Sequence, residues 1–320
     1  MKIVFLGTPD FGVPCLKALI NSKHKVVAVV TQPDKPSGRN KKIEFSPIKK
    51  VALENNIPVL QYARISKEGT QDLTNLQPDI MITAAYGQIL RQCILDIAKF
   101  GIINVHASLL PKFRGAAPIQ WAVIKGEKVS GITIMKTELG VDTGDIILQK
   151  ELPVGDIETA GELYNKLSNF APELLLNALS QIENCTVKYV SQNHEEMSYF
   201  PMIKKEDAQI DFNLSAVDVV NFVRGMNPFP TAFTILNGGI LKVFKAECAN
   251  LNFDKFVTAL NGQIILANFK QGLFVKCGDG KIVKLKQIQV QNGKKMLSEQ
   301  YLLGHKINAG EMLGAVNAKV

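Results

Sequence analysis

The sequence predicts an α/β protein in which a doubly wound, mainly parallel, Rossmann-like sheet domain is followed by a small, OB-like β-barrel domain. In the first half of the chain, short apolar runs alternate with amphipathic stretches, which is typical of parallel strands joined by helices. In the second half, short β-type runs are separated by Gly-containing turns, as in a small barrel. A chain of 320 residues is long enough for two such domains.

The first half supplies the elements of the sheet domain. The runs KIVFLG and KVVAVVT are rich in β-branched residues, and Pro47 in a first turn favours a helix after Ser46. Two β-type runs near residues 130–154 are expected to pair with each other. We expect strands at residues 2–7, 25–31, 78–87, 101–107, 130–137 and 144–154, and helices at residues 10–19, 46–55, 116–125 and 159–184.

The domain limits follow from a loss of periodic pattern late in the first half. Residues 188–207 are polar and short of regularly spaced apolar positions, so we expect a linker there. The catalytic sheet domain would then cover residues 1–187 and the barrel domain residues 208–320. In the barrel domain we expect a helix at residues 215–224, strands at residues 240–247, 262–269 and 272–290, and Gly turns at residues 237–239 and 278–280.

The sequence carries an excess of positive charge, with a formal net charge of +8. Residues 205–320 hold 14 Lys and Arg against 9 Asp and Glu, a net charge of +5. Such an excess suits a polyanionic partner such as RNA, and it equally fits a basic surface that binds nothing specific. Charge alone leaves both interpretations open.

Several classes of protein and site find no support. The first apolar run is broken by Pro9 and Asp10, which makes it too short for a signal peptide or a membrane-spanning helix. We therefore expect a cytoplasmic protein with no membrane partner. The five cysteines form no CxxC pair and the four histidines lack metal-site spacing, so we expect reduced cysteines and no metal. The loop GTPDFG is neither GxGxxG nor a P-loop, so a nucleotide site has little support.

The run GIINVHA ends in two polar residues, Asn104 and His106. Ligands of doubly wound sheets bind beyond the carboxyl ends of the strands, where this run ends. Because the two residues are two apart on a strand, their side chains point to the same side. A strand-end histidine is more often structural than catalytic, but the neighbouring amide needs partners that a substrate can supply. An amide and an imidazole together suit a carbonyl that becomes an oxyanion.

A catalytic imidazole needs a carboxylate that orients it. The segment ELGVDTGDIILQ, at residues 138–149, offers Asp142 and Asp145 in a Gly-flanked loop between two β-type runs. The same residues also fit a turn that uses Asp and Gly only for their backbone conformations. From the residues alone, both acids remain candidates.

The segments around these residues resemble a known family. NVHASLLPKFRGAAPIQWA together with GVDTGD resembles the 10-formyltetrahydrofolate-dependent formyltransferases. The segments FLGTPDFGVPCL, TQPDKPSGRNKK and AAYGQIL narrow the resemblance to the members that act on methionyl-tRNA. The likeness runs from Lys2 to about Leu303 and includes IDFNLSA, RGMNPFPTAF and GDG. The tail beyond Gly304 differs most from the family's sequence pattern, and we assign it no role.

By this resemblance, Asn104, His106 and Asp142 match the family's essential trio, which selects Asp142 over Asp145. The resemblance implies transfer of the formyl group of 10-formyltetrahydrofolate, a co-substrate, to the α-amine of methionyl initiator tRNA for translation initiation. Asn104 and His106 would donate hydrogen bonds to the oxyanion, while Asp142 would hold His106 and help to move protons. No metal is implied, because the folate supplies an activated acyl group.

The resemblance also implies binding positions. A rigid apolar loop would form a wall for the folate, and further residues would line the pterin pocket. These folate-binding candidates are Ser108, Leu109, Leu110, Pro111, Ile89 and Gly140. The basic segment at residues 32–50 would enter the tRNA acceptor stem, and the barrel domain would hold the tRNA along its inner side. The tRNA-binding candidates are Arg39, Lys41 and Lys42, although charge runs of this kind are usually solvated loops.

Two rival interpretations remain. A formyltransferase that acts on a small amine, such as an amino-sugar nucleotide or glycinamide ribonucleotide, would share the same trio. A folate-binding or RNA-binding protein without catalysis would not need it. The basic segment and the second domain favour the tRNA substrate, and we expect a monomer.

Overall fold

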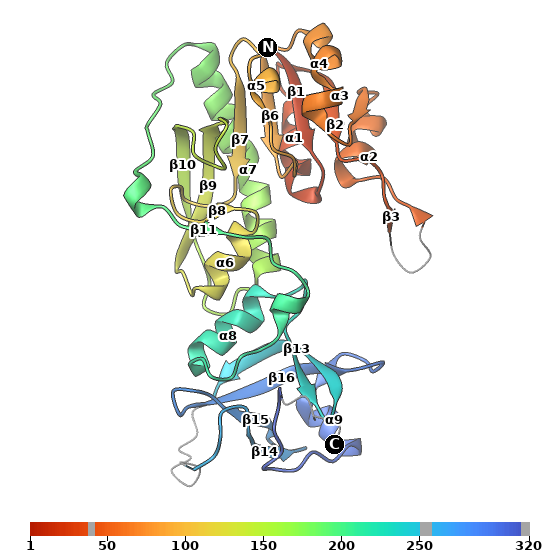
Figure 1. Ribbon diagram of the computed structural model, residues 1–320, viewed down its shortest axis with the longest axis vertical. Coiled ribbons are helices and arrows are strands. Elements are labelled where there is room, and N and C mark those ends of the chain that lie inside the picture. Colours follow the sequence, from red (N-terminus) through yellow and green to blue (C-terminus); the bar gives the residue numbers. More distant parts are fainter. Residues whose placement is uncertain (38–41, 250–257, 315–320) are drawn as a thin grey trace. The chain divides into compact units, whose positions relative to one another are not determined.

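The computed structural model describes residues 1–37, 42–249 and 258–314, and the chain divides into two compact units (Figure 1). The first unit comprises Met1–Pro118, Val129–Pro153 and Tyr164–Phe200, and the second comprises Ile119–Lys128, Val154–Leu163 and Pro201–Val320. Residues 188–200, which the sequence assigns to a linker, therefore belong to the first unit by their contacts. The linker and domain limits given above stay predictions.

The first unit is built on a seven-stranded sheet with the strand order β10-β9-β7-β6-β1-β2-β5. Neighbouring strands from β7 to β5 are parallel, whereas β9 runs antiparallel to β7 and β10 antiparallel to β9. These strands are β1 (Lys2–Gly7), β2 (Lys25–Thr31), β5 (Val59–Gln61), β6 (Ile80–Ala84), β7 (Ile102–His106), β9 (Val129–Lys136) and β10 (Ile146–Pro153).

Helices connect the parallel strands and cover the sheet (Figure 1). Ser46 caps α2, because its hydroxyl accepts a hydrogen bond from the Lys49 backbone N–H at 3.2 Å, with Pro47 in the first turn. The helices with residues in this unit are η1 (Asp10–Gly12), α1 (Val13–Ile20), α2 (Pro47–Glu54), α3 (Ile65–Glu68), α4 (Thr70–Leu76), α5 (Gln92–Leu95), α6 (Pro118–Ile124), α7 (Ala160–Glu183) and η2 (His194–Glu196).

The core of the first unit explains why its strands are apolar on both faces. Val4 and Leu6 of β1 pack in one cluster with Leu73 of α4 and Ile94 of α5. The residues that alternate with them along β1 point to the opposite face and are also fully buried. A sheet covered on both faces selects near-continuous apolar strands, which is the pattern that the sequence shows.

Two small strand pairs stand apart from the main sheet. The strands β3 (Pro36–Ser37) and β4 (Lys42–Ile43) pair antiparallel within the basic segment, residues 32–50. The strands β8 (Arg114–Gly115) and β11 (Tyr199–Phe200) pair in parallel although they are far apart in the sequence. This second pair attaches residues 199–200 to the segment that follows β7.

The second unit contains an antiparallel sheet with the order β12-β13-β16-β15-β14, and β17 pairs with β16. The sheet curls into a half-barrel (Figure 1). Asn237 and Gly238 both have positive φ and form the two-residue turn between β12 and β13, as expected for an Asn-Gly hairpin. The elements are η3 (Glu206–Ala208), α8 (Ala216–Gly225), β12 (Phe233–Leu236), β13 (Gly239–Cys248), β14 (Ile264–Asn268), β15 (Gly272–Lys276), β16 (Ile282–Val290), β17 (Met296–Leu297) and α9 (Ser298–Gly304).

The predicted fold class is confirmed: an α/β unit with a mainly parallel sheet precedes a unit with a curled β-sheet. The expected pairing of residues 130–137 with residues 144–154 is also present, as β9 and β10. The elements that the sequence missed in the first unit are short, namely β3, β4, β5, β8, β11, α3, α4, α5 and η2. Within the described ranges, none of the helices combines the length and apolar character that crossing a membrane requires.

Candidate active site

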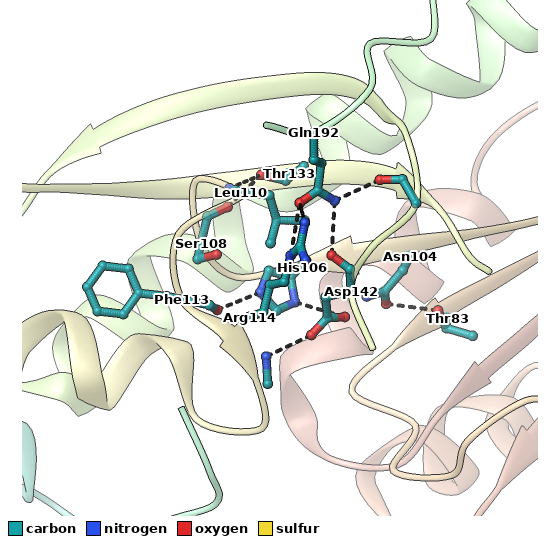
Figure 2. A network of polar contacts seen from close by, with 12 residues as sticks. Thr83, Asn104, His106, Ser108, Leu110, Phe113, Arg114, Thr133, Asp142 and Gln192 are labelled. Atoms are coloured by element: carbon teal, nitrogen blue, oxygen red, sulfur yellow. Dashed lines mark hydrogen bonds and ion pairs between the residues drawn. The ribbon is translucent and has the colours of Figure 1, made fainter. Parts of the chain in front are cut away.

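Strand β7 brings Asn104 and His106 to one cluster of polar contacts (Figure 2). Asn104 lies opposite Thr83 of β6, whose hydroxyl donates a hydrogen bond of 2.8 Å to the Asn104 Oδ1. This contact occupies the oxygen of the amide. Among the residues that the structure describes, none accepts a hydrogen bond from Asn104 Nδ2, so this half-buried NH₂ group is available as a donor.

His106 is buried, with only 6% of its surface exposed, and its two ring nitrogens have different surroundings. Nε2 lies 3.0 Å from the Phe113 carbonyl oxygen. A carbonyl can only accept, so Nε2 carries a hydrogen and is committed to this contact. Nδ1 faces Asp142 Oδ1 at 3.6 Å, which is longer than a hydrogen bond. Nδ1 is therefore the ring nitrogen that can exchange a proton or contact a substrate.

Asp142 reaches His106 by an indirect path, in the loop between β9 and β10 (residues 137–145, the Asp142 loop). The register of β7 and β9 places Lys136, the last residue of β9, beside Ile103. His106 is three residues further along β7, about 10 Å away at the rise of a strand. The Asp142 loop therefore doubles back along β7 before Asp142 meets His106.

Backbone contacts hold Asp142 in this position. Its Oδ2 accepts a hydrogen bond of 2.9 Å from the Gly115 backbone N–H, and its own φ of +52° is in the left-handed region. Gly115 has a φ of +104°, and a Cβ there would lie 2.2 Å from the Phe200 carbonyl oxygen. Position 115 thus requires glycine, because the backbone of β11 passes directly over it.

Gln192 and Arg114 complete the cluster, and the sequence analysis singled out neither of them. Gln192 Nε2 donates to the carbonyl oxygens of Asp142 and Gly144 at 2.9 and 2.7 Å. Its Oε1 accepts from Arg114 Nε and Nη2 at 3.1 and 2.6 Å. Gln192 lies in a polar segment without periodicity, so no sequence signal could have found it. Arg114 was visible only as part of the motif PKFRG.

Arg114 places a buried positive charge near the carboxylate. Only 4% of its surface is exposed, and its guanidinium also lies 3.4 Å from His194 Nδ1. Burial lowers the pKa of Arg114, and the negative charge of Asp142 opposes this shift. A guanidinium stays protonated in a protein, so Arg114 remains a buried cation close to Asp142.

Asp145 occupies a different position at the base of the same loop. Its backbone oxygen accepts from the Lys136 N–H at 2.9 Å, and its Oδ1 accepts from the Ser191 hydroxyl at 2.9 Å. Of the two acids that the residues alone could not separate, the structure brings Asp142 to His106 and leaves Asp145 beside the end of β9.

The predicted folate segment, Ser108 to Pro111, lies in a tightly held loop (residues 107–113, the Ser108 loop). The Thr133 hydroxyl donates to the Ser108 carbonyl oxygen at 2.6 Å and accepts from the Leu110 N–H at 3.2 Å. Gln149 Nε2 donates to the Leu110 carbonyl oxygen at 2.7 Å. Leu110 is buried, and a Cβ at Gly131 would lie 2.6 Å from the Leu109 side chain. Both leucines thus pack into the protein, and Pro111 is half-buried.

The remaining folate candidates are in exposed loops. Ile89 follows β6 and is 74% exposed. Gly140 belongs to the Asp142 loop, where the neighbouring Leu139 and Val141 are 61% and 45% exposed. Exposed large apolar side chains suit a flat aromatic ligand, and Val141 is the direct chain neighbour of Asp142.

The basic segment is described only in part. Arg39 and Lys41 lie outside the described residues, as does the side chain of Lys42 in β4. The ends of the segment are anchored, because Lys49 forms an ion pair with Asp34 and donates to Gln61 Oε1 at 2.9 Å. This ion pair and hydrogen bonding lower the pKa of Asp34.

The arrangement can stabilise an oxyanion and move a proton. Asn104 Nδ2 is a free donor, His106 Nδ1 is the ring nitrogen not committed to the Phe113 carbonyl, and Asp142 supplies the nearby negative charge. In the described ranges, no group of three or more His, Cys, Asp or Glu side chains is placed to hold a metal ion.

Comparisons with known proteins agree with this chemistry. A model of the formyl transferase family matches residues 1–179, and a model of the formyl transferase C-terminal domain matches residues 202–306. The methionyl-tRNA formyltransferase of Acetivibrio thermocellus is 46% identical over 315 residues, which cover 98% of this chain and 100% of that protein. The methionyl-tRNA formyltransferase of Clostridioides difficile is 45% identical with the same coverage.

A solved structure supports the fold. The sugar 3N-formyl transferase WlaRD, crystallised in the presence of dTDP and 5-N-formyl-THF, has a TM-score of 0.68 at 22% identity. The alignment covers 92% of this chain and 99% of that chain. At this identity the likeness shows the fold alone, whereas the two family models and the 46% identical relative span nearly the whole chain. The chain therefore belongs to the formyl transferase family.

Proposed function

We propose that the protein transfers the formyl group of 10-formyltetrahydrofolate to the α-amine of methionyl initiator tRNA, giving N-formylmethionyl-tRNA for translation initiation. The chain is an enzyme of the formyl transferase family, and its 45–46% identical relatives act on methionyl-tRNA. The observation that carries the proposal for the site is the convergence of the buried His106 with the half-buried Asn104 and Asp142 in one cluster.

The reaction requires an amine nucleophile and a polarised formyl group. The folate co-substrate supplies an activated formyl group and leaves as tetrahydrofolate. The α-amine of the methionyl ester attacks the formyl carbon, a new C–N bond forms, and the bond from that carbon to the folate nitrogen breaks. One proton of the amine must end on the folate nitrogen, so a residue near the reacting atoms has to move it.

The three residues divide this work. Asn104 Nδ2, the free donor of its amide, binds the formyl oxygen as negative charge develops on it. His106 acts through Nδ1, since Nε2 is bonded to the Phe113 carbonyl. Asp142 Oδ1 faces Nδ1 at 3.6 Å and orients the imidazole, and a proton carried on Nδ1 can be donated to the oxyanion. Removal of an oxyanion donor typically costs about 10²–10³ in rate.

The residues at the edges of the cluster fit the folate. Ile89, Leu139 and Val141 present exposed apolar surface, and the backbone of the Ser108 loop is held rigid by Thr133 and Gln149. A flat pterin ring suits such a surface. We assign Ser108, Leu109, Leu110, Pro111, Ile89 and Gly140 to the folate site.

The tRNA would be bound by positive charge from two parts of the chain. We assign Arg39, Lys41 and Lys42 to phosphate contacts in the acceptor stem, and residues 205–320 supply a further net charge of +5. With tRNA as the substrate, the protein would act in the cytoplasm, as a monomer.

The test is a comparison of three acceptors with 10-formyltetrahydrofolate: methionyl initiator tRNA, glycinamide ribonucleotide and an amino-sugar nucleotide. Formylation of the tRNA alone supports the proposal. Formylation of a small amine instead would favour the second candidate function, a formyltransferase that acts on a small amine. His106→Ala should abolish transfer while tRNA binding survives, and normal turnover of this variant would refute the catalytic trio.

A further inference from the structure

We propose that Gln192 is a positioning residue of the reaction, which sets the rate of the chemical step by holding Asp142 against His106. This inference rests on the proposed function of Asp142. The hydrogen bonds of Gln192 go to Arg114 and to the backbone of Asp142 and Gly144, so it acts through the backbone of the Asp142 loop.

The contacts of Gln192 use its whole amide. Both recorded hydrogen bonds of its NH₂ group go to carbonyl oxygens of the Asp142 loop, those of Asp142 at 2.9 Å and Gly144 at 2.7 Å. Its oxygen accepts two hydrogen bonds from the Arg114 guanidinium (Figure 2). The side chain is 6% exposed, so water does not substitute for these partners at low cost.

The path of the Asp142 loop explains why it needs such support. The register of β9 leaves this loop beside Ile103, and the loop must return along β7 to bring Asp142 to His106. Asp142 also adopts a positive φ, which costs free energy in a residue with a Cβ. A loop that doubles back with an unfavourable backbone conformation keeps its shape only where other contacts determine it.

Arg114 makes the support rigid. Its backbone belongs to β8, and the next residue, Gly115, donates its N–H to Asp142 Oδ2 at 2.9 Å. Its guanidinium donates a hydrogen bond to Gln192 Oε1, and Gln192 Nε2 donates to the backbone carbonyl oxygen of Asp142. Asp142 is therefore fixed at its carboxylate by β8 and at its carbonyl by Gln192, and the two supports are joined through Arg114.

The functional consequence follows from the distance between Asp142 and His106. At 3.6 Å the carboxylate acts on the imidazole by charge and orientation rather than through a short hydrogen bond. A displacement of about 1 Å at a catalytic group can cost about 10²-fold in rate. Loss of the Gln192 support should therefore lower kcat and leave the binding of both substrates intact.

The experiment uses two substitutions that separate positioning from stability. Gln192→Glu keeps an oxygen for Arg114 but puts the second oxygen against two carbonyl oxygens, so only the support of the loop is lost. Gln192→Met removes both functions and leaves the buried guanidinium of Arg114 short of an acceptor. Gln71→Glu is the matched control, because Gln71 lies exposed on α4 and donates only to Asn75.

For each protein we would measure kcat, both KM values, the Kd of tetrahydrofolate by calorimetry, and Tm. We expect Gln192→Glu to lower kcat about 10- to 100-fold and to lower Tm, because two buried carbonyl oxygens lose their donor, while both KM values and the Kd stay close to wild type. Gln192→Met should lower kcat by a similar factor and lower Tm as well. Gln71→Glu should match wild type throughout.

Two results would overturn the inference. One is a wild-type kcat in folded Gln192→Glu. The other is a kcat that falls only together with Tm and tetrahydrofolate binding in both variants, which would make Gln192 a purely structural residue.

The proposed function is tested separately by the wild-type acceptor comparison. If the wild type formylates a small amine rather than the tRNA, the variants are assayed with that amine, and the Gln192 inference stands or falls on those rates. If the wild type transfers formyl to none of the acceptors, both the proposed function and the inference are refuted.

Discussion

The two loops that form the candidate active site are held in different ways. The Ser108 loop is supported by Thr133 of β9 and Gln149 of β10, which belong to the adjoining strands of the same sheet. The Asp142 loop is supported by Gln192, which lies 50 residues further along the chain from Asp142. The middle of the Ser108 loop is thus held by the sheet, although its last residue, Phe113, also donates its N–H to the Ser198 hydroxyl at 2.9 Å. The backbone of Asp142, in contrast, is held by a side chain from a separate segment.

This difference indicates different roles. A loop braced by its own sheet offers a fixed surface, which suits the binding of a co-substrate. A loop braced from outside can place one side chain where the register of its strands would not. Substitutions in the first should thus affect binding and stability, and substitutions in the second should affect the chemical step.

Of the substitutions in the two loops, Asp142→Asn should give the largest effect, a loss of about 10⁴-fold in kcat, as for the buried carboxylate that orients histidine in a serine protease. The amide removes the negative charge that faces His106 Nδ1 at 3.6 Å. Steady-state formylation of methionyl-tRNA measures it. Asp145→Asn is the matched control from the same loop and should retain most activity. If Asp145→Asn lost more activity than Asp142→Asn, Asp145 rather than Asp142 would be the catalytic acid.

Asn104→Ala should lower kcat by about 10²–10³-fold, because it removes one oxyanion donor. The KM values should change little, since the donor acts mainly in the transition state. Thr83→Val tests how the donor is oriented: it removes the hydroxyl bonded to Asn104 Oδ1 and should cost less than loss of the donor itself. Equal activity of Asn104→Ala and wild type would exclude Asn104 from the reaction.

Thr133→Val should destabilise the protein by about 1–3 kcal/mol, because the buried partners Ser108 and Leu110 lose a hydrogen bond. The KM for 10-formyltetrahydrofolate should also rise. Thermal unfolding and steady-state kinetics check both effects. Thr137→Val is the stability control, since its buried hydroxyl has no hydrogen-bond partner among the described residues, and its Tm should not fall. A lower Tm in the control alone would contradict our account.

Arg39→Ala should give the smallest effect, and it lies outside both loops. Loss of one phosphate contact should raise the KM for tRNA severalfold and reduce the slope of log affinity against log salt by about 1. Binding of tetrahydrofolate should not change. If the tRNA kinetics and the salt dependence both match wild type, the basic segment is a solvated surface.

Local patterns predicted much of the fold. The alternation of apolar runs and amphipathic stretches predicted the main strands and helices, because it reflects which residues are buried on each element. The cap at Ser46 and the turn at Asn237 were readable because they depend on a few neighbouring residues. The short elements α3 and α4 were missed, since four to seven residues carry too little periodicity.

The site was predicted in part for the same reason. Asn104 and His106 share one side of a strand, which follows from spacing alone. Gln192 was not found, because its segment is polar, lacks periodicity and resembles a linker. Its role depends on the pairing of β11 with β8, which brings residues 199–200 to Gly115 across a long stretch of chain.

The sequence by itself determined the class of the fold, the strand that carries the amide and the imidazole, and the family. Only the tertiary structure decided which acid of the Asp142 loop meets His106, which ring nitrogen is free, and which residues hold the acid in place. The physical reason is the range of the interactions. Burial patterns and turns are encoded over a few residues, whereas the path of the Asp142 loop depends on hydrogen bonds from Gly115 and Gln192, which lie far from Asp142 in the chain.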